Sequence, residues 1–252
     1  MKADTVDLLI LAGTFEARQL AHAVFKASPN LAAVVSYAGI VSDLPDLPLP
    51  SRIGGFGGVE GLADYLRKKD VRLVVDATHP YAAQMSRNAA IACEQTGTAL
   101  IRLERASWLP SEEDNWTGVS SMDAACDQLE PQSRVFLAVG RKDLQPFLKR
   151  DDLFALARMI EPPDYALPSG WHLELARPAQ SVEAELDLLQ RHRITRLVCK
   201  NSGGTRAFAK LEAARLLKLP VTMVERPKLP STTTASAVEE LLEMISAQLM
   251  TS

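Results

Sequence analysis

Short apolar segments alternate with longer segments of helical periodicity along almost the whole chain, and this alternation constrains the fold more than any other feature. The strand-like runs of the first part are residues 6–12, 31–36, 72–76 and 99–103. Helical spacing follows the first and third of these runs, over residues 15–26 and about 81–95. Strands that alternate with helices in this way favour an α/β fold with a mostly parallel sheet and right-handed crossovers.

A second series of such patterns begins near the middle of the chain. Its strand-like runs are residues 134–139, 153–157, 172–175, 196–200 and 221–224. Two series predict two sheets, and the segment Glu130 to Ser133, which precedes a fresh strand, places the boundary between two α/β domains of residues 1–131 and 132–252. A single continuous sheet is the alternative.

Charge, cysteine content and hydropathy exclude several classes of protein. The 252-residue chain has a formal net charge of −3, without the basic excess that is typical of nucleic-acid binders. Its three cysteines and four histidines are scattered, which fits neither a disulfide framework nor a zinc site. No apolar stretch approaches the ~20 residues needed to cross a membrane, and the run at residues 8–12 is too short for a signal peptide. We expect a cytoplasmic protein, a monomer or weak homodimer, with no metal, nucleic-acid or membrane partner.

The end of the first strand is a candidate phosphate site, because ligands of open α/β sheets bind beyond the carboxyl ends of the strands. Gly13 lets a ligand approach the backbone there, and Thr14 can cap the following helix. The free N–H groups of that helix suit a phosphate. The run is not a G-x-G-x-x-G fingerprint, so an ordinary strand-to-helix turn is the alternative.

The strand at residues 72–76 also ends in a polar cluster. Thr78 or His79 would cap a helix that begins near Tyr81 and has Pro80 in its first turn. The imidazole of His79 titrates near neutral pH and could donate a proton. The alternative is a capping threonine beside a structural histidine.

Two strand ends in the second series carry cations. Arg141 and Lys142 follow one strand directly and suit an anionic ligand, although a solvated basic turn is the alternative. Residues 200–206 place a Ser-Gly-Gly turn among cations, which favours a phosphate or carboxylate site over a plain loop.

Two further segments have a composition that suits a flat ligand with many carboxylates. Four glycines surround Phe56 at residues 54–58, and such a loop either presses its backbone against a ligand or serves as a flexible connector. Residues 102–108 combine cations with an indole, which suits a planar polycarboxylate or, alternatively, forms a surface ion-pair patch.

The second strand bears on the choice of cofactor. NAD-binding sheets usually place an acidic residue at the end of this strand, on the ribose hydroxyl. Here the strand ends in Ser36, Tyr37 and Ala38, which leaves room for a 2′-phosphate and favours NADP. Ser36 and Arg52 are the candidates to meet that phosphate.

Several of these motifs follow one another in a fixed order along the chain. They are Gly13-Thr14-x-Glu16-Ala17-Arg18, residues 54–58, residues 76–82, Arg102-x-Glu104-Arg105 with Trp108, residues 200–204, residues 210–214 and residues 220–227. Together they resemble the precorrin-6A reductase family of cobalamin biosynthesis. The resemblance spans residues 8–227, and the runs at 76–80 and 200–204 are its most specific parts. Where that family often has a first glycine, this chain has Ala12, which leaves the helix-start site intact.

The resemblance implies a fold and a reaction. The fold would be two Rossmann-like domains with mostly parallel sheets and a cleft between them. The enzyme would use NADPH to reduce one double bond of the macrocycle in precorrin-6A, or in cobalt-precorrin-6A, to give precorrin-6B. The substrate would be a tetrapyrrole with acetate and propionate arms, and neither a metal nor a flavin would take part.

The resemblance also implies roles for individual residues. The turn and helix start near NADPH would be Gly13, Thr14, Glu16, Ala17 and Arg18. The nicotinamide side would be lined by Thr78, His79, Pro80 and Tyr81. The second domain would contact the cofactor through Lys200, Asn201, Ser202, Gly203 and Gly204. Substrate arms would meet Gly54, Gly55, Phe56, Gly57, Arg105 and Arg141. The proton donor would be His79, Tyr81 or a bound water.

Two other classes of function remain open from the residues alone. A nucleotide or sugar-phosphate transferase could use the same glycine turns, but it needs metal-binding carboxylates near the phosphates, and only Asp76 lies in such a place. A non-catalytic two-domain ligand-binding protein would also have two α/β halves.

Overall fold

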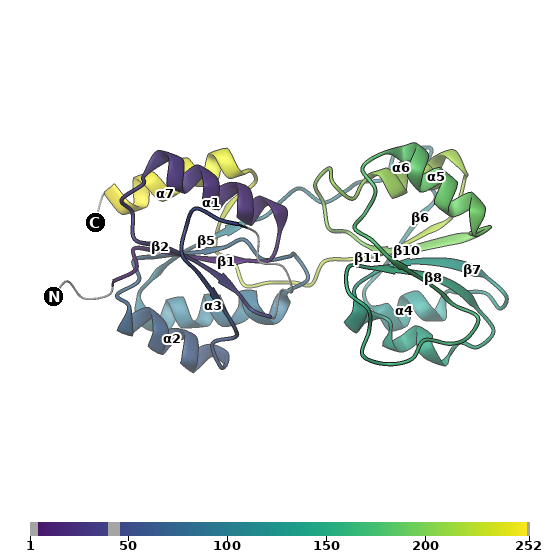
Figure 1. Ribbon diagram of the computed structural model, residues 1–252, viewed down its shortest axis with the longest axis horizontal. Helices are drawn as coiled ribbons and strands as arrows, with labels where there is room; N and C mark the ends of the chain where they lie inside the picture. The colour runs from purple at the N-terminus through teal and green to yellow at the C-terminus, as the bar shows by residue number, and fades with distance from the viewer. Residues whose placement is uncertain (1–4, 40–45, 251–252) are drawn as a thin grey trace. The chain divides into compact units, whose positions relative to one another are not determined.

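The computed structural model describes residues 5–39 and 46–250 and consists of two compact units (Figure 1). Residues up to Arg105, together with those from Lys228 onward, form the first unit, and Ala106–Pro227 form the second. Each unit contains one six-stranded sheet whose neighbouring strands all run parallel. The predicted α/β class with two sheets is confirmed, and the single continuous sheet is excluded. Within the described ranges, no helix combines the length and the hydropathy needed to cross a membrane.

The sheet of the first unit has the strand order of a doubly wound α/β fold. From edge to edge its strands are β3 (Ser51–Ile53), β2 (Ala33–Tyr37), β1 (Leu8–Ala12), β4 (Leu73–Asp76), β5 (Ala99–Leu103) and β12 (Thr233–Ala235). Numbered along the chain within the unit, this order is 3-2-1-4-5-6. The chain therefore turns to opposite sides after β1 and after β4, which lie side by side with Leu8 beside Leu73. The ends of these two strands form the topological switch point of the first unit.

Helices cover both faces of this sheet, because its central strands are buried on both faces. Every residue of β1 and of β4 is buried. On one face, α1 (Phe15–Ala27) and α7 (Val238–Met250) pack over the core that includes Ile10. On the other face, α2 (Gly58–Lys68) and α3 (Ala83–Thr96) pack over the core that includes Leu9 (Figure 1). Strands that are buried on both faces appear in a sequence as continuous apolar runs, and for this reason the sequence pattern predicts them.

The sheet of the second unit repeats the order of the first five strands, but its sixth strand comes from an earlier part of the chain. From edge to edge its strands are β9 (His172–Leu175), β8 (Phe154–Met159), β7 (Arg134–Ala138), β10 (Arg196–Lys200), β11 (Val221–Val224) and β6 (Trp116–Val119). The first five strands follow the order 3-2-1-4-5, and β6, which precedes them in sequence, takes the sixth place beside β11. The switch point of the second unit therefore lies at the ends of β7 and β10.

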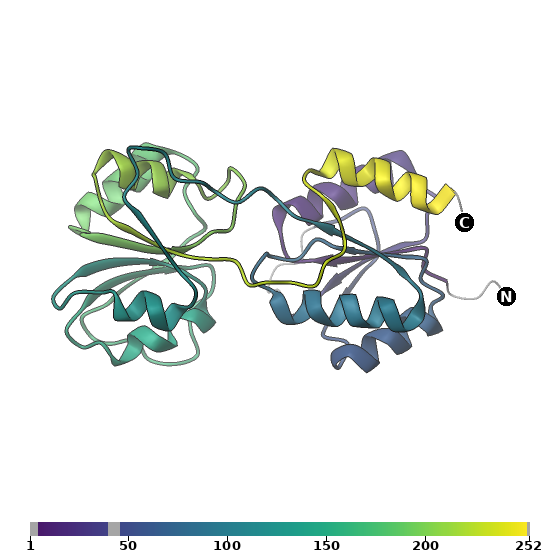
Figure 2. The same cartoon turned by 180° about the vertical axis from the view of Figure 1, so that it is seen from behind.

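Helices also lie on both faces of the second sheet. They are α4 (Met122–Asp127), α5 (Val182–Arg191) and α6 (Ala209–Leu216), with two 3₁₀ segments at Arg141–Asp143 and Gln145–Lys149. α5 and α6 cover one face and α4 lies on the other (Figures 1 and 2). The segment that follows β7 is therefore 3₁₀ rather than α-helical.

The units divide the chain at positions other than the predicted boundary between residues 131 and 132. β6 lies before that boundary but pairs with β11 in the second sheet, and β12 lies after it but pairs with β5 in the first. Both are short edge strands without a long apolar run, so the sequence pattern did not reveal them. The segment Glu130 to Ser133 marks only the approach to β7 inside the second unit.

Gly61 lies within α2, at a place where the backbone leaves no room for a side chain. A Cβ atom added there would lie 1.7 Å from the carbonyl oxygen of Phe56. Alanine is favoured over glycine by about 1 kcal/mol in an unobstructed helix. We nevertheless expect Gly61→Ala to lower the free energy of unfolding by about 1–3 kcal/mol, because the backbone must move to accept the methyl group. Urea denaturation followed by circular dichroism measures this difference.

The matched control is Gly170→Ala, because an added Cβ at Gly170 meets nothing within 4 Å. Its free energy of unfolding should change by less than about 0.5 kcal/mol. If Gly61→Ala proved as stable as the parent protein, the close approach of the Phe56 carbonyl to α2 would be wrong.

Candidate functional site

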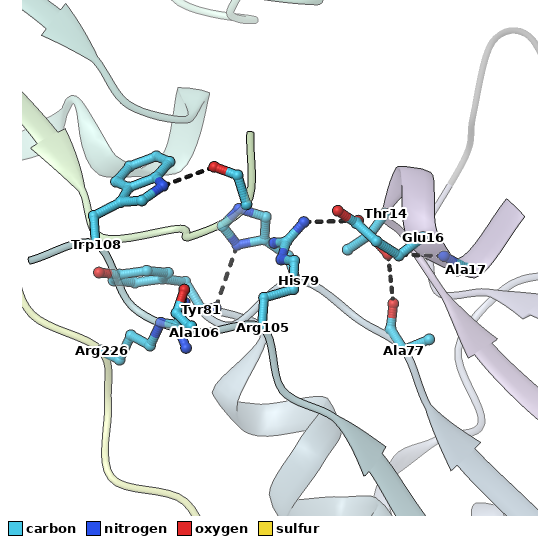
Figure 3. A network of polar contacts seen from close by, with 11 residues as sticks. Thr14, Glu16, Ala17, Ala77, His79, Tyr81, Arg105, Ala106, Trp108 and Arg226 are labelled. Carbon is cyan, nitrogen blue, oxygen red and sulfur yellow. Dashed lines mark hydrogen bonds and ion pairs between the residues drawn. The ribbon is translucent and has the colours of Figure 1, made fainter. Parts of the chain in front are cut away.

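One hydrogen-bonding side chain ties together the two turns at the switch point of the first unit. The hydroxyl of Thr14 donates to the carbonyl oxygen of Ala77, which follows β4, at 2.9 Å (Figure 3). The hydroxyl oxygen of Thr14 in turn accepts from the backbone N–H of Ala17 at 3.1 Å, so Thr14 is the N-cap of α1, as predicted. The turn after β1 is therefore held in place by the end of β4.

The turn before α1 is open to a ligand. Gly13 is exposed, and a Cβ atom added to it would meet nothing within 4 Å. The helix dipole places partial positive charge at this end of α1. Arg18 adds a full charge near this end, with its guanidinium 5.6 Å from the centre of the Phe15 ring. This arrangement can bind a phosphate group.

Glu16 and Arg105 form an ion pair that fixes the first turn of α1. Nη1 of Arg105 donates to Oε2 of Glu16 at 2.7 Å, and both side chains are largely buried (Figure 3). Burial alone would raise the pKa of Glu16, but the hydrogen bond and charge of Arg105, with bonds to the local backbone and Thr14, bring that pKa below its ordinary value. Arg105 thus has a structural partner within the first unit, and its predicted contact with substrate stays a prediction.

A buried carboxylate organises the turn after β4. Oδ1 of Asp76 accepts from the backbone N–H of Thr78 at 3.2 Å and from the Thr78 hydroxyl at 2.6 Å. Oδ2 accepts from Nε of Arg102 at 3.4 Å, and Nη1 of Arg102 donates to the carbonyl oxygen of Pro230 at 3.1 Å. Asp76 and Arg102 are only 1% and 5% exposed, so this ion pair is part of the core. Asp76 and Arg102 lie in register on the adjacent strands β4 and β5, a pairing that the sequence pattern alone does not reveal.

The helix after this turn begins later than predicted. α3 starts at Ala83 with Ala82 as its N-cap, and no side chain caps it. Neither Thr78 nor His79 is the cap, and Pro80 precedes the helix. The reason is local hydrogen bonding: Thr78 bonds to Asp76, and Nδ1 of His79 accepts from the backbone N–H of Tyr81 at 3.3 Å (Figure 3). Four residues of the predicted site therefore form a turn of their own above β4.

Ser36 and Arg52 lie together, at neighbouring positions of β2 and β3. Nη1 of Arg52 donates to the Ser36 hydroxyl at 2.7 Å, and Nη2 donates to the carbonyl oxygen of Gly55 at 3.2 Å. The guanidinium carbon of Arg52 lies 4.0 Å from the centre of the Phe56 ring, which in turn packs edge-on against Tyr65. Phe56 therefore supports Arg52. These contacts hold a cation in one orientation at the end of β2.

The glycine loop after β3 needs glycine for its backbone conformation. Gly54 and Gly57 have φ angles of 114° and 85°, which other residues rarely adopt. Added Cβ atoms would meet nothing within 4 Å at Gly54, Gly55 or Gly57, so this side of the loop is open.

The switch point of the second unit is occupied by one of its own carboxylates. Oδ2 of Asp143 accepts from the backbone N–H of Gly140 at 3.2 Å and forms a short ion pair with Nζ of Lys200. The charge of Lys200 is thus compensated across the ends of β7 and β10. Arg141 donates to the carbonyl oxygen of Pro162 at 3.5 Å and is partly exposed. Lys200, one of the cations predicted to bind an anionic ligand, is therefore already paired with Asp143.

The turn at residues 201–204 packs against other backbone of its own unit. The side-chain amide of Asn201 accepts from the N–H of Trp108 at 2.8 Å and donates to its carbonyl oxygen at 2.9 Å. Nε1 of Trp108 donates to the carbonyl oxygen of Gly204 at 2.7 Å (Figure 3). A Cβ at Gly203 would lie 2.3 Å from the carbonyl oxygen of Ala106. Asn201 and Gly203 thus have structural reasons to be present.

Lys210, which the sequence places after this turn, is buried beneath Trp108. Its Nζ lies 4.7 Å from the centre of the indole and donates to the carbonyl oxygen of Ala207. Burial lowers the pKa of Lys210. Its cation is therefore not available at the surface of the second unit.

The first unit brings its predicted residues together around one switch point. They are Gly13, Thr14, Glu16, Ala17 and Arg18 from the turn and start of α1, Ser36 and Arg52 from the adjacent strands, and Thr78, His79, Pro80 and Tyr81 from the turn after β4. Arg141 and residues 200–204 lie at the separate switch point of the second unit. Among the described residues, no group of three histidine, cysteine, aspartate or glutamate side chains could hold a metal ion. The open helix start and the nearby cations of the first unit can bind a phosphorylated ligand.

Comparisons with known proteins find similar sequences over most of the chain. The family described as precorrin-6x reductase CbiJ/CobK matches residues 7–246. The precorrin-6A reductase of Rhodobacter capsulatus is 44% identical over 237 residues, which cover 93% of this chain and 94% of that protein. The precorrin-6A reductase of Rhodococcus erythropolis is 46% identical over 228 residues, with 90% and 91% covered. The cobalt-precorrin-6A reductase of Priestia megaterium is 32% identical, with 94% and 97% covered.

A solved structure is also similar over nearly the whole chain. A protein described as CobK precorrin-6A reductase superposes with a TM-score of 0.89 at 43% identity, and the match covers 97% of this chain and 98% of that one.

The Glu16–Arg105 pair predicts a pH-dependent loss of stability. Because the pKa of Glu16 is lower in the folded protein than in the unfolded chain, the ionised pair stabilises the fold above the ordinary glutamate pKa of 4.5. That contribution disappears as the pH falls through the lowered pKa. We expect Glu16→Gln to reduce the free energy of unfolding by about 1 kcal/mol at pH 7, with the difference from the parent protein shrinking below about pH 4.5. Urea titrations at a series of pH values test this.

Asp64→Asn is the control, since Asp64 pairs with Arg67 but is 77% exposed. This substitution should have little effect on stability at pH 7. A stability difference for Glu16→Gln that stayed constant down to pH 3 would contradict the ionised pair.

Proposed function

Because the chain belongs to the precorrin-6A reductase family of cobalamin biosynthesis, we propose that NADPH is its reductant and that the first unit binds this cofactor. The observation that supports the proposal is that one unit has both an open helix start and an arginine held in one orientation by its neighbours. Gly13 and the N-terminus of α1 form the open helix start, and Arg52 is the fixed cation at the end of the neighbouring strands.

The strand order sets the direction in which the dinucleotide would lie. A doubly wound sheet consists of two mononucleotide-binding halves that meet at the switch point. The half formed by β1, β2 and β3 takes the adenosine end, and the half that begins with β4 takes the nicotinamide end. The pyrophosphate lies between them, against Gly13, Thr14 and the first N–H groups of α1. Glu16, Ala17 and Arg18 complete this first turn.

Ser36 and Arg52 support NADPH over NADH. An acidic side chain at the end of β2 would bind the free ribose hydroxyl of NADH and repel a phosphate, and none is present there. Arg52 instead presents a guanidinium that is oriented by Ser36, Gly55 and Phe56. A guanidinium held in this way binds a phosphate through charge-assisted hydrogen bonds.

The turn of residues 78–81 lines the nicotinamide end in this proposal. NADPH supplies a hydride to one carbon of the substrate double bond, and a proton added to the neighbouring carbon completes the reduction to precorrin-6B and NADP⁺. Nδ1 of His79 accepts from the N–H of Tyr81, and this hydrogen bond fits a neutral ring with its proton on Nε2. To act as the donor, His79 would have to take up a second proton and lose this hydrogen bond. Tyr81 and a bound water are the other candidate donors.

The substrate carries acetate and propionate arms, which need cations or backbone N–H groups. Residues 54–57, Arg105 and Arg141 are the proposed contacts. In the second unit, residues 200–204 are proposed to contact the cofactor, although Lys200 and Asn201 also have the structural partners described above. Relatives named precorrin-6A reductase are 39–46% identical to this chain, whereas those named cobalt-precorrin-6A reductase are 25–32% identical. We therefore propose the metal-free macrocycle as the substrate.

Turnover measurements test this function directly. The purified protein is mixed without oxygen with precorrin-6A and NADPH, and the loss of NADPH absorbance is recorded. NADH and cobalt-precorrin-6A are substituted in parallel reactions. Oxidation of NADPH that depends on precorrin-6A supports the proposal. Equal rates with NADH would contradict the assignment of Ser36 and Arg52, and faster turnover of the cobalt form would contradict the metal-free substrate.

A substitution of Arg52 tests the proposed preference for NADPH over NADH. Replacing it by glutamine removes a charged donor to the 2′-phosphate, and hydrogen bonds to charged groups contribute about 1.5–3 kcal/mol. We expect Arg52→Gln to weaken NADPH binding by roughly 10- to 100-fold and to leave NADH binding within about twofold. Isothermal titration calorimetry with both dinucleotides measures the two effects.

Arg67→Gln is the matched control, because Arg67 is a largely exposed arginine of α2 that pairs only with Asp64 in the described structure. It should bind both dinucleotides as the parent protein does. Equal weakening of NADPH and NADH by Arg52→Gln would show that Arg52 supports the loop rather than the phosphate.

A further inference from the structure

The hydroxyl group of Thr78 can act only as an acceptor toward a ligand. Oδ1 of Asp76 accepts from the backbone N–H of Thr78, and Oδ2 accepts from Nε–H of Arg102, and both of these groups can only donate. Both carboxylate oxygens therefore serve as acceptors. The hydrogen in the 2.6 Å contact between Oδ1 and the Thr78 hydroxyl must come from Thr78 itself. Its remaining hydrogen-bonding capacity lies in the oxygen lone pairs.

The buried ion pair prevents this polarity from reversing. Asp76 is 1% exposed and Arg102 is 5% exposed, and they lie in register on the adjacent strands β4 and β5. Nη1 of Arg102 is held in addition by the carbonyl oxygen of Pro230. Neither side chain can turn away without leaving the other as an unpaired charge in the core. Thr78, by contrast, is only partly buried and lies in the turn just beyond the end of β4.

We propose that Oγ1 of Thr78 accepts a hydrogen bond from the carboxamide NH₂ group of the nicotinamide, and that Asp76 and Arg102 are the positioning residues that make it an acceptor. This inference rests on the proposed function, which places the nicotinamide end of the cofactor at β4. The ligand chemistry it specifies is an amide donor. A cofactor whose carboxamide is held at one edge cannot turn its ring over, so the bond also decides which face of the ring meets the substrate.

An analogue of the cofactor isolates this single bond. In the 3-acetylpyridine analogue of NADP⁺, a methyl group replaces the carboxamide NH₂, so the donor is lost while shape and charge are kept. Calorimetric titration of the parent protein should show NADP⁺ binding about five- to tenfold more tightly than the analogue, the usual effect of one neutral hydrogen bond. No turnover is needed for this measurement.

Two variants of Thr78 test whether the preference depends on its hydroxyl. Thr78→Val keeps the shape but removes the oxygen, so NADP⁺ should weaken to the affinity of the analogue, whose own affinity should not change. Thr78→Ser keeps the hydroxyl and should retain the preference. Thr96→Val is the control, because the Thr96 hydroxyl bonds to the carbonyl oxygens of Ala92 and Cys93 at the far end of α3. It should bind both dinucleotides as the parent does.

Asp76→Asn tests the positioning role. Arg102 is charged and still needs an acceptor, so the new amide should turn its oxygen toward Arg102 and its NH₂ toward Thr78, at the cost of the bond from the Thr78 backbone N–H. The Thr78 hydroxyl must then accept from that amide and direct its own hydrogen at the ligand. The preference for NADP⁺ should then reverse in favour of the analogue, whereas loss of local structure alone would only abolish it. If Asp76→Asn fails to fold, the Thr78 variants still decide the matter.

The possible failures can be told apart. Equal binding of NADP⁺ and its analogue by the parent protein overturns this inference and leaves the proposed function intact. A preference for NADP⁺ that survives in Thr78→Val also overturns it. If the parent protein binds neither dinucleotide, the proposed function itself is wrong, and the inference falls with it.

Discussion

The hydrogen bond from Thr14 to the carbonyl oxygen of Ala77 is the interaction on which the site of the first unit depends. Strands β1 and β4 are adjacent, and the backbone N–H of Ala77 still donates to the carbonyl oxygen of Leu11. Beyond that bond, the chain leaves the two strands toward opposite faces of the sheet. Thr14 holds their following turns together while it also caps α1. The open helix start at Gly13 and the polar turn of residues 78–81 are thereby kept at one place. A dinucleotide, which combines phosphate groups with a ring, would need both the helix start and the polar turn.

The two units have the same strand order and yet fill their switch points differently. In the first unit, Gly13 follows β1 and the space beside it is empty of protein atoms within 4 Å of an added Cβ. In the second, Gly140 follows β7, and its backbone N–H already donates to the carboxylate of Asp143, which also neutralises Lys200. The N–H group of Gly140 and the cation of Lys200, which could otherwise bind a phosphate, therefore both bond to Asp143. Similar topology therefore leaves the switch point open at Gly13 in one unit and fills the corresponding place with an internal ion pair in the other.

The sequence was sufficient for the fold class and for the positions of both switch points. Strands such as β1 and β10 are buried on both faces, so they appear as apolar runs, and the polar residues that follow them mark the strand ends. The sequence was insufficient for the unit boundary, because the edge strands β6 and β12 are short, partly exposed and paired with distant strands. It also placed the start of α3 too early, since no residue pattern showed that Thr78 would bond to Asp76. The absence of an acid after β2 singled out Ser36 and Arg52, but their mutual hydrogen bond, like the Glu16–Arg105 pair, required the folded chain.

The two most specific motifs of the sequence turn out to differ in what their side chains leave available. In residues 200–204, the amide of Asn201 uses an acceptor and a donor on the backbone of Trp108, and Gly203 is required by the nearby carbonyl of Ala106. Packing within the second unit is enough to explain Asn201 and Gly203. In residues 76–80, Asp76 is likewise consumed by internal bonds, but those bonds leave the Thr78 oxygen with acceptor capacity in a partly exposed turn. A motif that identifies a family therefore need not mark a ligand contact. A polar residue of such a motif stays available to a ligand only where the internal hydrogen bonds leave part of its hydrogen-bonding capacity unused.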